Sequence, residues 1–454
     1  MGYEYQIPIT EDGVELQLGQ QSPKRSIAGR LIRITLTIVL AVASVSFFSS
    51  SPLAPQYAGV FQPPQRDDWF LPVDDGELVE CYRKDADPAL VRHDEPHERH
   101  ECPMHFIPIT DFSLNASSIY FFAHDTTYGN ITFDVAESDS DEIAVSAEIG
   151  YCRDLVADVC KFRRGDGALG VGVVLPPGSP HGPEYRAHEG LEDHIHHLES
   201  NYVKLVVKFP ASATPFTMHS LENRLPLYSH TLGPLGDRVH FDRLDLRTDN
   251  EPIRSESVTA ARLAVRTSNA NIDGTYNATD FLSIIAANAP INVTVSLETT
   301  AETGSNKPAI LELVTSNGKL EAMISLTAAA NAMPGEFTVR TITASAPLNV
   351  TFASAPPNST LDYHGSTTNA PLNVTLHASY EGKLNVATVL LDASININNA
   401  TTDPADLNRN RSVTYRNVGL SMLEGEVYWG DKTTATPAGS VHVVTSLAFA
   451  GLSL

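Results

Sequence analysis

The sequence predicts a mainly β protein in which a stacked-rung β-solenoid makes up most of the chain, after one transmembrane helix near the N-terminus. Three observations lead to this fold class. A short turn followed by alternating apolar and polar residues occurs six times between residues 248 and 372, as in repeats that stack on one another. No amphipathic helix is evident after residue 110. An apolar run occupies residues 31–48, and such a run is typical of a membrane span or a signal sequence.

Length and charge limit the classes of protein that fit. The chain has 454 residues, of which 42% are hydrophobic and 19% are charged. This composition is ordinary for a folded protein with a sizeable core. The formal net charge is −23, from 31 Lys and Arg against 54 Asp and Glu. Nucleic acid is therefore not expected as a partner, because phosphate backbones bind basic surfaces.

The N-terminal segments predict a membrane anchor. Residues 1–30 form a polar tail with lysine and arginine towards its end, and the apolar segment 31–51 follows. Positive charge before the segment places the tail in the cytosol. We therefore expect an uncleaved signal-anchor and a single-pass type II membrane protein, with the bulk of the chain extracellular or lumenal. The alternative is a cleavable signal with Ala41-Val42-Ala43 as its site, which gives a secreted glycoprotein.

Nine N-x-Ser/Thr sequons support the same topology. All of them follow the apolar segment, and none lies in the tail. One sequon is a weak signal, but nine on one side of a membrane segment indicate a glycosylated domain outside the cytosol. The candidate N-glycosylation sites are Asn115, Asn130, Asn277, Asn292, Asn349, Asn358, Asn373, Asn399 and Asn410.

Two short segments precede the β-rich part. Residues 52–66 are rich in proline and glutamine, which predicts an extended stalk above the membrane. Residues 67–110 contain two cysteines and many charges but little periodicity. We expect them to form a loop-rich cap.

The four cysteines predict two disulfides. Cys81, Cys102, Cys152 and Cys160 all follow the apolar segment, and an even number outside the cytosol is typical of paired cysteines. We expect the local pairs Cys81–Cys102 and Cys152–Cys160, because each closes a short loop at low entropic cost. A zinc site of four thiolates is the alternative, but the chain lacks a C-x2-C knuckle.

Residues 111–454 are expected to form the solenoid ectodomain. Before the repeats, strand composition occurs at residues 118–122, 130–135, 143–149 and 202–210. Residues 163–200 interrupt this pattern with glycine, proline, histidine and acidic residues. They predict a surface insertion.

Every repeat has the same pattern, a turn of Ser/Thr, Asn and Ala/Gly/Pro followed by an alternating strand. The copies begin at Thr248, Thr267, Ala286, Thr315, Thr343 and Thr367. Neighbouring residues along a strand face opposite sides. The apolar residue after the turn should therefore point inwards and the next residue outwards. We expect Ile291, Leu348 and Leu372 to be buried and Asn292, Asn349 and Asn373 to be exposed.

These residues carry a resemblance to a known family. The strand ending Lys208-Phe209-Pro210, the segment Leu246-Arg247-Thr248-Asp249-Asn250 and the Ser/Thr-Asn-Ala/Gly series resemble the putative-adhesin or "toast-rack" β-solenoid domains. The variant Asn-Ala-Pro-Leu-Asn-Val-Thr is similar to functionally uncharacterised membrane glycoproteins of filamentous fungi. The resemblance covers about residues 112–454. It implies an adhesin-like scaffold and supplies no catalytic residues.

Clustered histidines are the candidate metal ligands. One group is His93, His97, His100 and His105, and the other is His188, His194, His196 and His197. Imidazoles at such spacing can converge on a transition metal, and His194 and His196 are the tightest pair. Because no H-E-x-x-H pattern occurs, we favour solvated, acid-rich loops, and we expect no cofactor.

Carboxylates give the alternative function, a carbohydrate-active enzyme on a β-helix. Asp139, Asp141 and Glu142 lie together, and Asp242 and Asp245 flank an Arg-Leu pair. Glycosidases need two such groups, and Asp139-Ser140-Asp141 also matches the D-x-D pattern of Golgi glycosyltransferases. Those enzymes need helices that the sequence lacks.

Since solvated turns explain the acids, we expect no catalytic residues and no enzyme. The favoured function is a non-enzymatic, single-pass glycoprotein of the cell surface or secretory pathway with an adhesin-like solenoid. Its expected partners are the membrane and either a cell-wall polysaccharide or a surface protein.

Overall fold

The computed structural model describes the chain from Gly76 to its C-terminus with several gaps. The described residues are 76–82, 105–123, 127–137, 142–151, 157–174, 202–211, 214–299, 307–329, 335–398, 402–418, 421–430 and 439–454. Among them, no helix is long and apolar enough to cross a membrane. The predicted tail, membrane segment and stalk lie outside them, as do Cys102, Cys152, Asn399, His194 and His196.

The described residues form strands and connections, with no helix among them. The mainly β fold class is thus confirmed. The strands in chain order are β1 (Glu77–Tyr82), β2 (His105–Leu114), β3 (Ser118–Ala123), β4 (Tyr128–Val135), β5 (Ile143–Tyr151), β6 (Asp158–Arg163), β7 (Leu169–Val174), β8 (Tyr202–Phe209), β9 (Phe216–Arg224), β10 (Tyr228–Pro234), β11 (Val239–Arg247), β12 (Ile253–Thr267), β13 (Ile272–Ala286), β14 (Ile291–Thr299), β15 (Ala309–Thr315), β16 (Leu320–Ala328), β17 (Glu336–Ile342), β18 (Leu348–Ser354), β19 (Thr360–Thr367), β20 (Leu372–Thr375), β21 (Gly382–Thr388), β22 (Ala393–Asn396), β23 (Arg411–Asn417), β24 (Met422–Trp429), β25 (Gly439–Thr445) and β26 (Ala450–Ser453).

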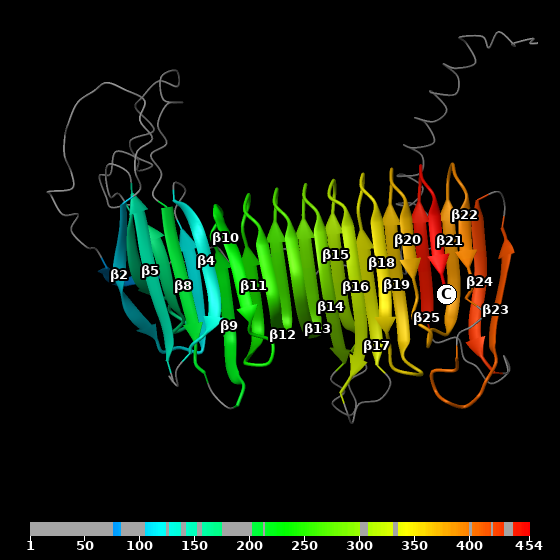
Figure 1. The fold of residues 1–454 in the computed structure, drawn as a ribbon, viewed down its shortest axis with the longest axis horizontal. Coiled ribbons are helices and arrows are strands. Elements are labelled where there is room, and N and C mark those ends of the chain that lie inside the picture. The colour runs from blue at the N-terminus through cyan, green and yellow to red at the C-terminus, as the bar shows by residue number, and fades with distance from the viewer. Residues whose placement is uncertain are drawn as a thin grey trace, which may run out of the picture. The chain divides into compact units, whose positions relative to one another are not determined.

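The strands form a solenoid-like stack in which each rung has one strand before a sharp turn and one strand after it. We call the two layers the pre-turn sheet and the post-turn sheet. In the central rungs, β15, β17 and β19 pair in parallel in the pre-turn sheet, and β14, β16, β18 and β20 do so in the post-turn sheet. The long strands β12 and β13 run through both layers, with two register shifts near the passage from one layer to the other. Figure 1 shows the resulting row of strands.

The core lies between the two sheets. Phe121 of β3 and Phe133 of β4 meet edge to face with their ring centroids 5.7 Å apart, and Phe352 of β18 and Tyr363 of β19 do so at 5.3 Å. In each pair, one ring comes from the pre-turn sheet and the other from the post-turn sheet. Aromatic side chains supply large apolar area for such a core.

The expected inward positions after the turns are confirmed. Ile291, Leu348 and Leu372 are all fully buried, and Leu320 opposes Ile291 on one side and Leu348 on the other. The column therefore contains one apolar side chain from each rung. Because each side chain packs against those of the rungs on both sides, no copy can bury its apolar face alone.

The turns stack as regularly as the strands. The buried hydroxyl of Thr315 donates to the carbonyl oxygen of Ala289, in the turn of the preceding rung, over 3.1 Å. The side-chain amides of Asn269, Asn288 and Asn317 each donate to the asparagine oxygen of the preceding rung at 2.7–2.8 Å, starting from Asn250. The Thr and Asn of the repeat thus satisfy polar groups that the stacking of turns brings together.

The ends of the stack do not follow chain order. At the N-terminal end, β7 lies outside β3, and the antiparallel strands β6 and β1 come after it. In the other sheet, β8 lies outside β4, followed by antiparallel β5 and β2. At the C-terminal end, β25 lies between β19 and β21, and antiparallel β24 and β23 close the pre-turn sheet.

Part of the predicted insertion at residues 163–200 is strand, which corrects that boundary. Arg163 ends β6, and residues 169–174 form β7. The glycines in Leu169-Gly-Val-Gly-Val-Val suggested a loop. In the fold, a Cβ at Gly170 or Gly172 would collide with the ring of Tyr120 or Phe122. The glycines therefore make room for aromatic rings on the outer side of the pre-turn sheet.

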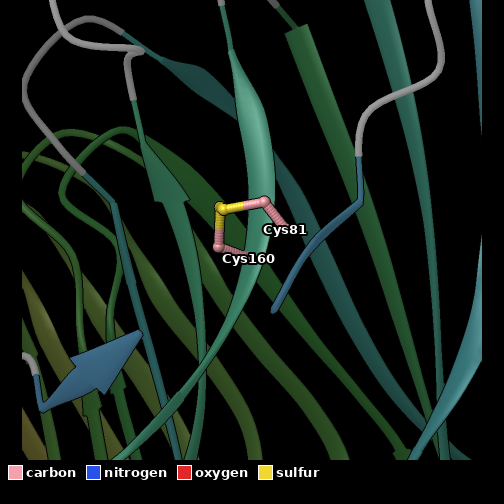
Figure 2. The surroundings of a disulfide bond; sticks show 2 residues. All are labelled: Cys81 and Cys160. Atoms are coloured by element: carbon pink, nitrogen blue, oxygen red, sulfur yellow. A yellow bond between two sulfur atoms is a disulfide. The ribbon is translucent and has the colours of Figure 1, made fainter. Parts of the chain in front are cut away.

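The predicted local disulfide pairs are wrong for both described cysteines. Cys81 of β1 is bonded to Cys160 of β6, 79 residues away, as Figure 2 shows. The two residues are directly opposite each other in the antiparallel pairing of β1 with β6. The preference for short loops failed because sheet pairing brings these distant residues together before the bond has to close any loop.

The fold predicts a large penalty for charge in the apolar column. We expect Leu348→Asp to lower the free energy of unfolding by more than about 3 kcal/mol, because it buries an unpaired carboxylate between rungs. Ala353 lies on the exposed side of the same strand, and Ala353→Asp is expected to cost less than about 1 kcal/mol. Urea denaturation of both variants checks the difference. Equal losses would contradict the inward column.

The register also predicts the second disulfide. Cys81–Cys160 leaves Cys102 and Cys152 as partners for each other, and His105 opposes Tyr151 at the near ends of β2 and β5. We expect non-reducing peptide mapping to recover Cys81 linked to Cys160 and Cys102 linked to Cys152. Recovery of a Cys81–Cys102 peptide would contradict the pairing of β1 with β6.

Candidate functional site

The outward side of the post-turn sheet is polar and carries the sequons. We call it the asparagine face and define it by Asn277, Asn292, Asn349, Asn373 and the threonines two residues after the last three. Asn349 is directly opposite Asn373 on the next rung. The Asn373 amide donates to the Asn349 side-chain oxygen over 3.1 Å. Glu321 and Met323 of β16 occupy the same two columns between β14 and β18, so the face presents amides and hydroxyls on β14, β18 and β20.

The sequons are distributed unequally between the two sheets. Asn130, Asn277, Asn292, Asn349 and Asn373 are all on strands of the post-turn sheet. Asn292 and Asn373 are exposed as expected, and Asn349 is half-buried. The exposed Asn115, Asn358 and Asn410 lie in connections between strands. Among the eight described sequons, none is on a strand that belongs only to the pre-turn sheet.

The outward side of the pre-turn sheet carries arginines in two columns. In one column, Arg224, Arg247 and Arg266 are directly opposite one another on three successive rungs. In the other column, Arg243 is directly opposite Arg262 on the next rung. We call these five residues the arginine face. They concentrate positive charge on a chain whose net charge is −23, so the face stands out from the rest of the protein.

Two carboxylates lie between the arginine columns. Glu222 opposes Asp245 on the next rung. Burial raises the pKa of Asp245, although the charges of Arg224, Arg266 and Arg243 counteract this effect. Arg164 donates to Glu222 over 3.1 Å and stacks over the ring of Tyr120. Arg262 also donates to Asp280 over 2.9 Å, so the five arginines lie among three acids and the face has more arginines than acids.

An apolar strip continues the arginine face along the same side of the pre-turn sheet. Phe281 opposes Ile310, and Ile285 opposes Val314, which in turn opposes Ile342. All five side chains are partly accessible. Between these residues, Glu312 and Arg340 pair over 3.5 Å. The strip therefore combines apolar side chains with an ion pair, a mixture found on contact surfaces.

The candidate catalytic acids have separate partners. The exposed Asp242 contacts the His219 ring over 3.0 Å, whereas Asp245 lies among the arginines. Glu142 is exposed, and Asp139 and Asp141 lie outside the described residues. The described residues contain no group of three or more His, Cys, Asp or Glu side chains that could hold a metal ion.

A buried histidine is the feature that the sequence did not reveal. His230 opposes Ile253 in the otherwise apolar column after the turns, and it is fully buried. Within the described part of the chain, neither ring nitrogen has a partner at normal hydrogen-bonding geometry, and the same is true of the buried Asn223 side chain. Burial lowers the pKa of His230 to about 3, and the Leu225 backbone offsets only part of this effect. His230 occupies the inward position of one further copy of the repeat, before the copy that begins at Thr248. That copy was not recognisable in the sequence because its turn, Leu225-Pro226-Leu227, lacks the Ser/Thr-Asn pattern.

Comparisons with known proteins identify little. No protein-family model matches the sequence, and no curated protein matches it. Among solved structures, the chain is similar to the crystal structure of a putative cell adhesion protein from Clostridium sporogenes, with 6% identity and a TM-score of 0.15. The alignment covers 77% of this chain and 98% of that chain. A TM-score this low does not establish a shared fold.

His230 predicts a loss of stability in acid. Its folded-state pKa of about 3 lies below the ordinary value of 6.5. The unfolded chain therefore binds more protons below pH 6.5, and stability falls as the pH drops towards 3. For a shift of this size the loss at pH 5 is about 2 kcal/mol relative to pH 8.

We expect His230→Ile, which continues the apolar column, to remove this part of the pH dependence. Urea denaturation of the wild type and the variant at pH 8 and pH 5 isolates the residue from the other histidines. If the stability difference between the two proteins is the same at both pH values, His230 is not buried in its neutral form.

Proposed function

We propose that the chain is a non-enzymatic, single-pass glycoprotein of the cell surface or secretory pathway, and that its toast-rack-like solenoid is an adhesin-like scaffold. The apolar segment 31–51 would anchor it as a type II protein. The observation that carries the proposal is the unequal distribution of sequons. Among the described residues, all five sequons on strands lie on the post-turn sheet, and the opposite face bears arginines and an apolar strip instead.

The stack suits a scaffold because its interior strands are paired on both sides. In the described residues, the pre-turn sheet contains fifteen strands in one row, from β1 at one end to β23 at the other. At about 4.8 Å between strands, the row is about 65 Å long. Such a structure holds its faces in fixed positions along that length.

The two faces suit different roles. Glycans need solvent, so the asparagine face would be covered by carbohydrate and kept from close protein contact. The arginine face and the apolar strip would remain accessible to a partner, such as a cell-wall polysaccharide or a surface protein. Arginine forks bind carboxylates in two-point contacts, so the partner is expected to carry acidic groups.

Glycan mapping tests the proposal directly. We expect enzymatic glycan release in heavy-oxygen water to label Asn277, Asn292 and Asn373 in protein purified from a eukaryotic host. Arg262→Asn with Ala264→Thr introduces a sequon on the arginine face and should abolish binding of the ectodomain to the cell surface. Arg262→Asn alone removes the same arginine without a sequon and should reduce this binding less. Surface labelling of intact cells, with a tag at each terminus, should reach only the C-terminal tag.

Three outcomes would contradict the proposal. Unmodified asparagines on the post-turn sheet would remove the basis for assigning the two faces. Labelling of the N-terminal tag on intact cells would reverse the topology. Turnover of a polysaccharide by the purified ectodomain, abolished by changing one carboxylate, would show an enzyme.

A further inference from the structure

The C-terminal rung lies out of sequence inside the stack. β25 pairs in parallel with β19 on one side and with β21 on the other, and β26 pairs likewise with β20 and β22. The segment Gly439–Leu454, which we call the C-terminal arch, thus separates two rungs that follow each other in the chain. Figure 1 shows β25 between β20 and β21.

The arch is held on both sides along its whole length. At its turn, the Leu447 amide donates to the Thr368 carbonyl oxygen over 2.9 Å, and the Leu390 amide donates to that of Ser446 over 3.2 Å. At its end, the Leu454 amide donates to the carbonyl oxygen of Asn396 over 2.9 Å. Removing the arch would therefore leave two facing rungs with unpaired backbone groups.

The side chains of the arch also fill the core between the two rungs. Val441, Val443, Ala450 and Leu452 are fully buried. Val443 opposes Gly365 on one side and Val386 on the other. The inward side of the gap between the rungs is therefore apolar. It accepts a segment in which every second side chain is apolar and points into the core.

Residues 431–438 connect β24 to the arch. Val427 of β24 opposes Gly382, which opposes Gly439, so β24 and β25 are two strand spacings apart, or about 10 Å. Eight residues can span about 26 Å. The rungs on both sides of the gap precede the arch in the chain, so they are synthesised before it.

We propose that the gap between the rungs β19–β20 and β21–β22 is a binding slot for a β-arch, and that a second copy of this chain can fill it with its own C-terminal arch. The contacts are the same whichever copy supplies the arch, which is the condition for exchange of an element between copies. The linker favours the chain's own arch in dilute solution, because it keeps that arch at a high effective concentration. At high concentration, an arch that leaves its own slot transiently can enter the empty slot of a second copy. The two copies are then joined by backbone hydrogen bonds between strands, as in β-strand addition.

The test uses the full chain with a site-specific protease sequence in place of residues 432–437. After folding, cleavage leaves the arch bound without a covalent link. We expect a fluorescent peptide of residues 439–454 to replace it, one per chain, when the cleaved protein is warmed gently. A peptide with Val443→Asp should be incorporated at least about tenfold less. Val444 is on the outward side of the same strand, opposite the uncharged Ser366 and Ala387, so a peptide with Val444→Asp should be incorporated normally.

A second measurement uses intact copies that carry two different N-terminal tags. We expect them to co-purify after joint warming at high concentration, and an excess of the wild-type peptide to prevent this. If the cleaved protein releases its arch and keeps its unfolding midpoint, β21 has closed onto β19 and no slot exists. If neither the peptide nor a second copy enters, the arch is a fixed part of the fold and the proposal is wrong.

Discussion

Parallel pairing in register between successive rungs is the constraint on which the rest of this structure depends. One copy of the repeat offers two short strands and a single line of apolar side chains, which is too little to form a core. When Leu348 sits between Leu320 and Leu372, with its neighbours in the same register, every inward residue gains partners above and below. The same register aligns the turns, so that the side chains of Asn269, Asn288 and Asn317 form hydrogen bonds from one rung to the next.

A stack built in this way needs ends, and both ends of this one depart from chain order. Antiparallel strands close the pre-turn sheet, with β1 and β6 at one end and β24 and β23 at the other. At the first end, the Cys81–Cys160 disulfide joins the two outermost strands. At the second, the chain returns and places its C-terminal arch inside the stack. Within the described residues, the outermost strands β1 and β23 each pair on one side only, so the edges of this sheet are antiparallel rather than repeat strands.

Strand alternation also separates the chemistry of the outside from that of the core. Inward positions are apolar in almost every rung, so outward positions are free to vary. On the post-turn sheet several of them are asparagine and threonine, interrupted by Glu321 and Met323 on β16. On the pre-turn sheet they became arginines, acids and an apolar strip. His230 is the exception among inward positions, and its lowered pKa reflects a ring buried where other rungs have isoleucine or leucine.

The sequence by itself determined the repeat, the strands of its copies and most of their inward and outward residues, because these depend on local alternation and turn chemistry. Ile291, Leu348 and Leu372 could be placed in the core, and Asn292 and Asn373 outside it, without any structure. Local patterns could not determine which strands become neighbours. The position of β7 outside β3, the pairing of Cys81 with Cys160 and the insertion of β25 between β19 and β21 all join residues far apart in the chain. Only the tertiary structure decided these, because each depends on long-range backbone pairing that any strand of similar composition could provide. The two unlike faces followed from that pairing, since a column of arginines or asparagines exists only once the rungs are in register.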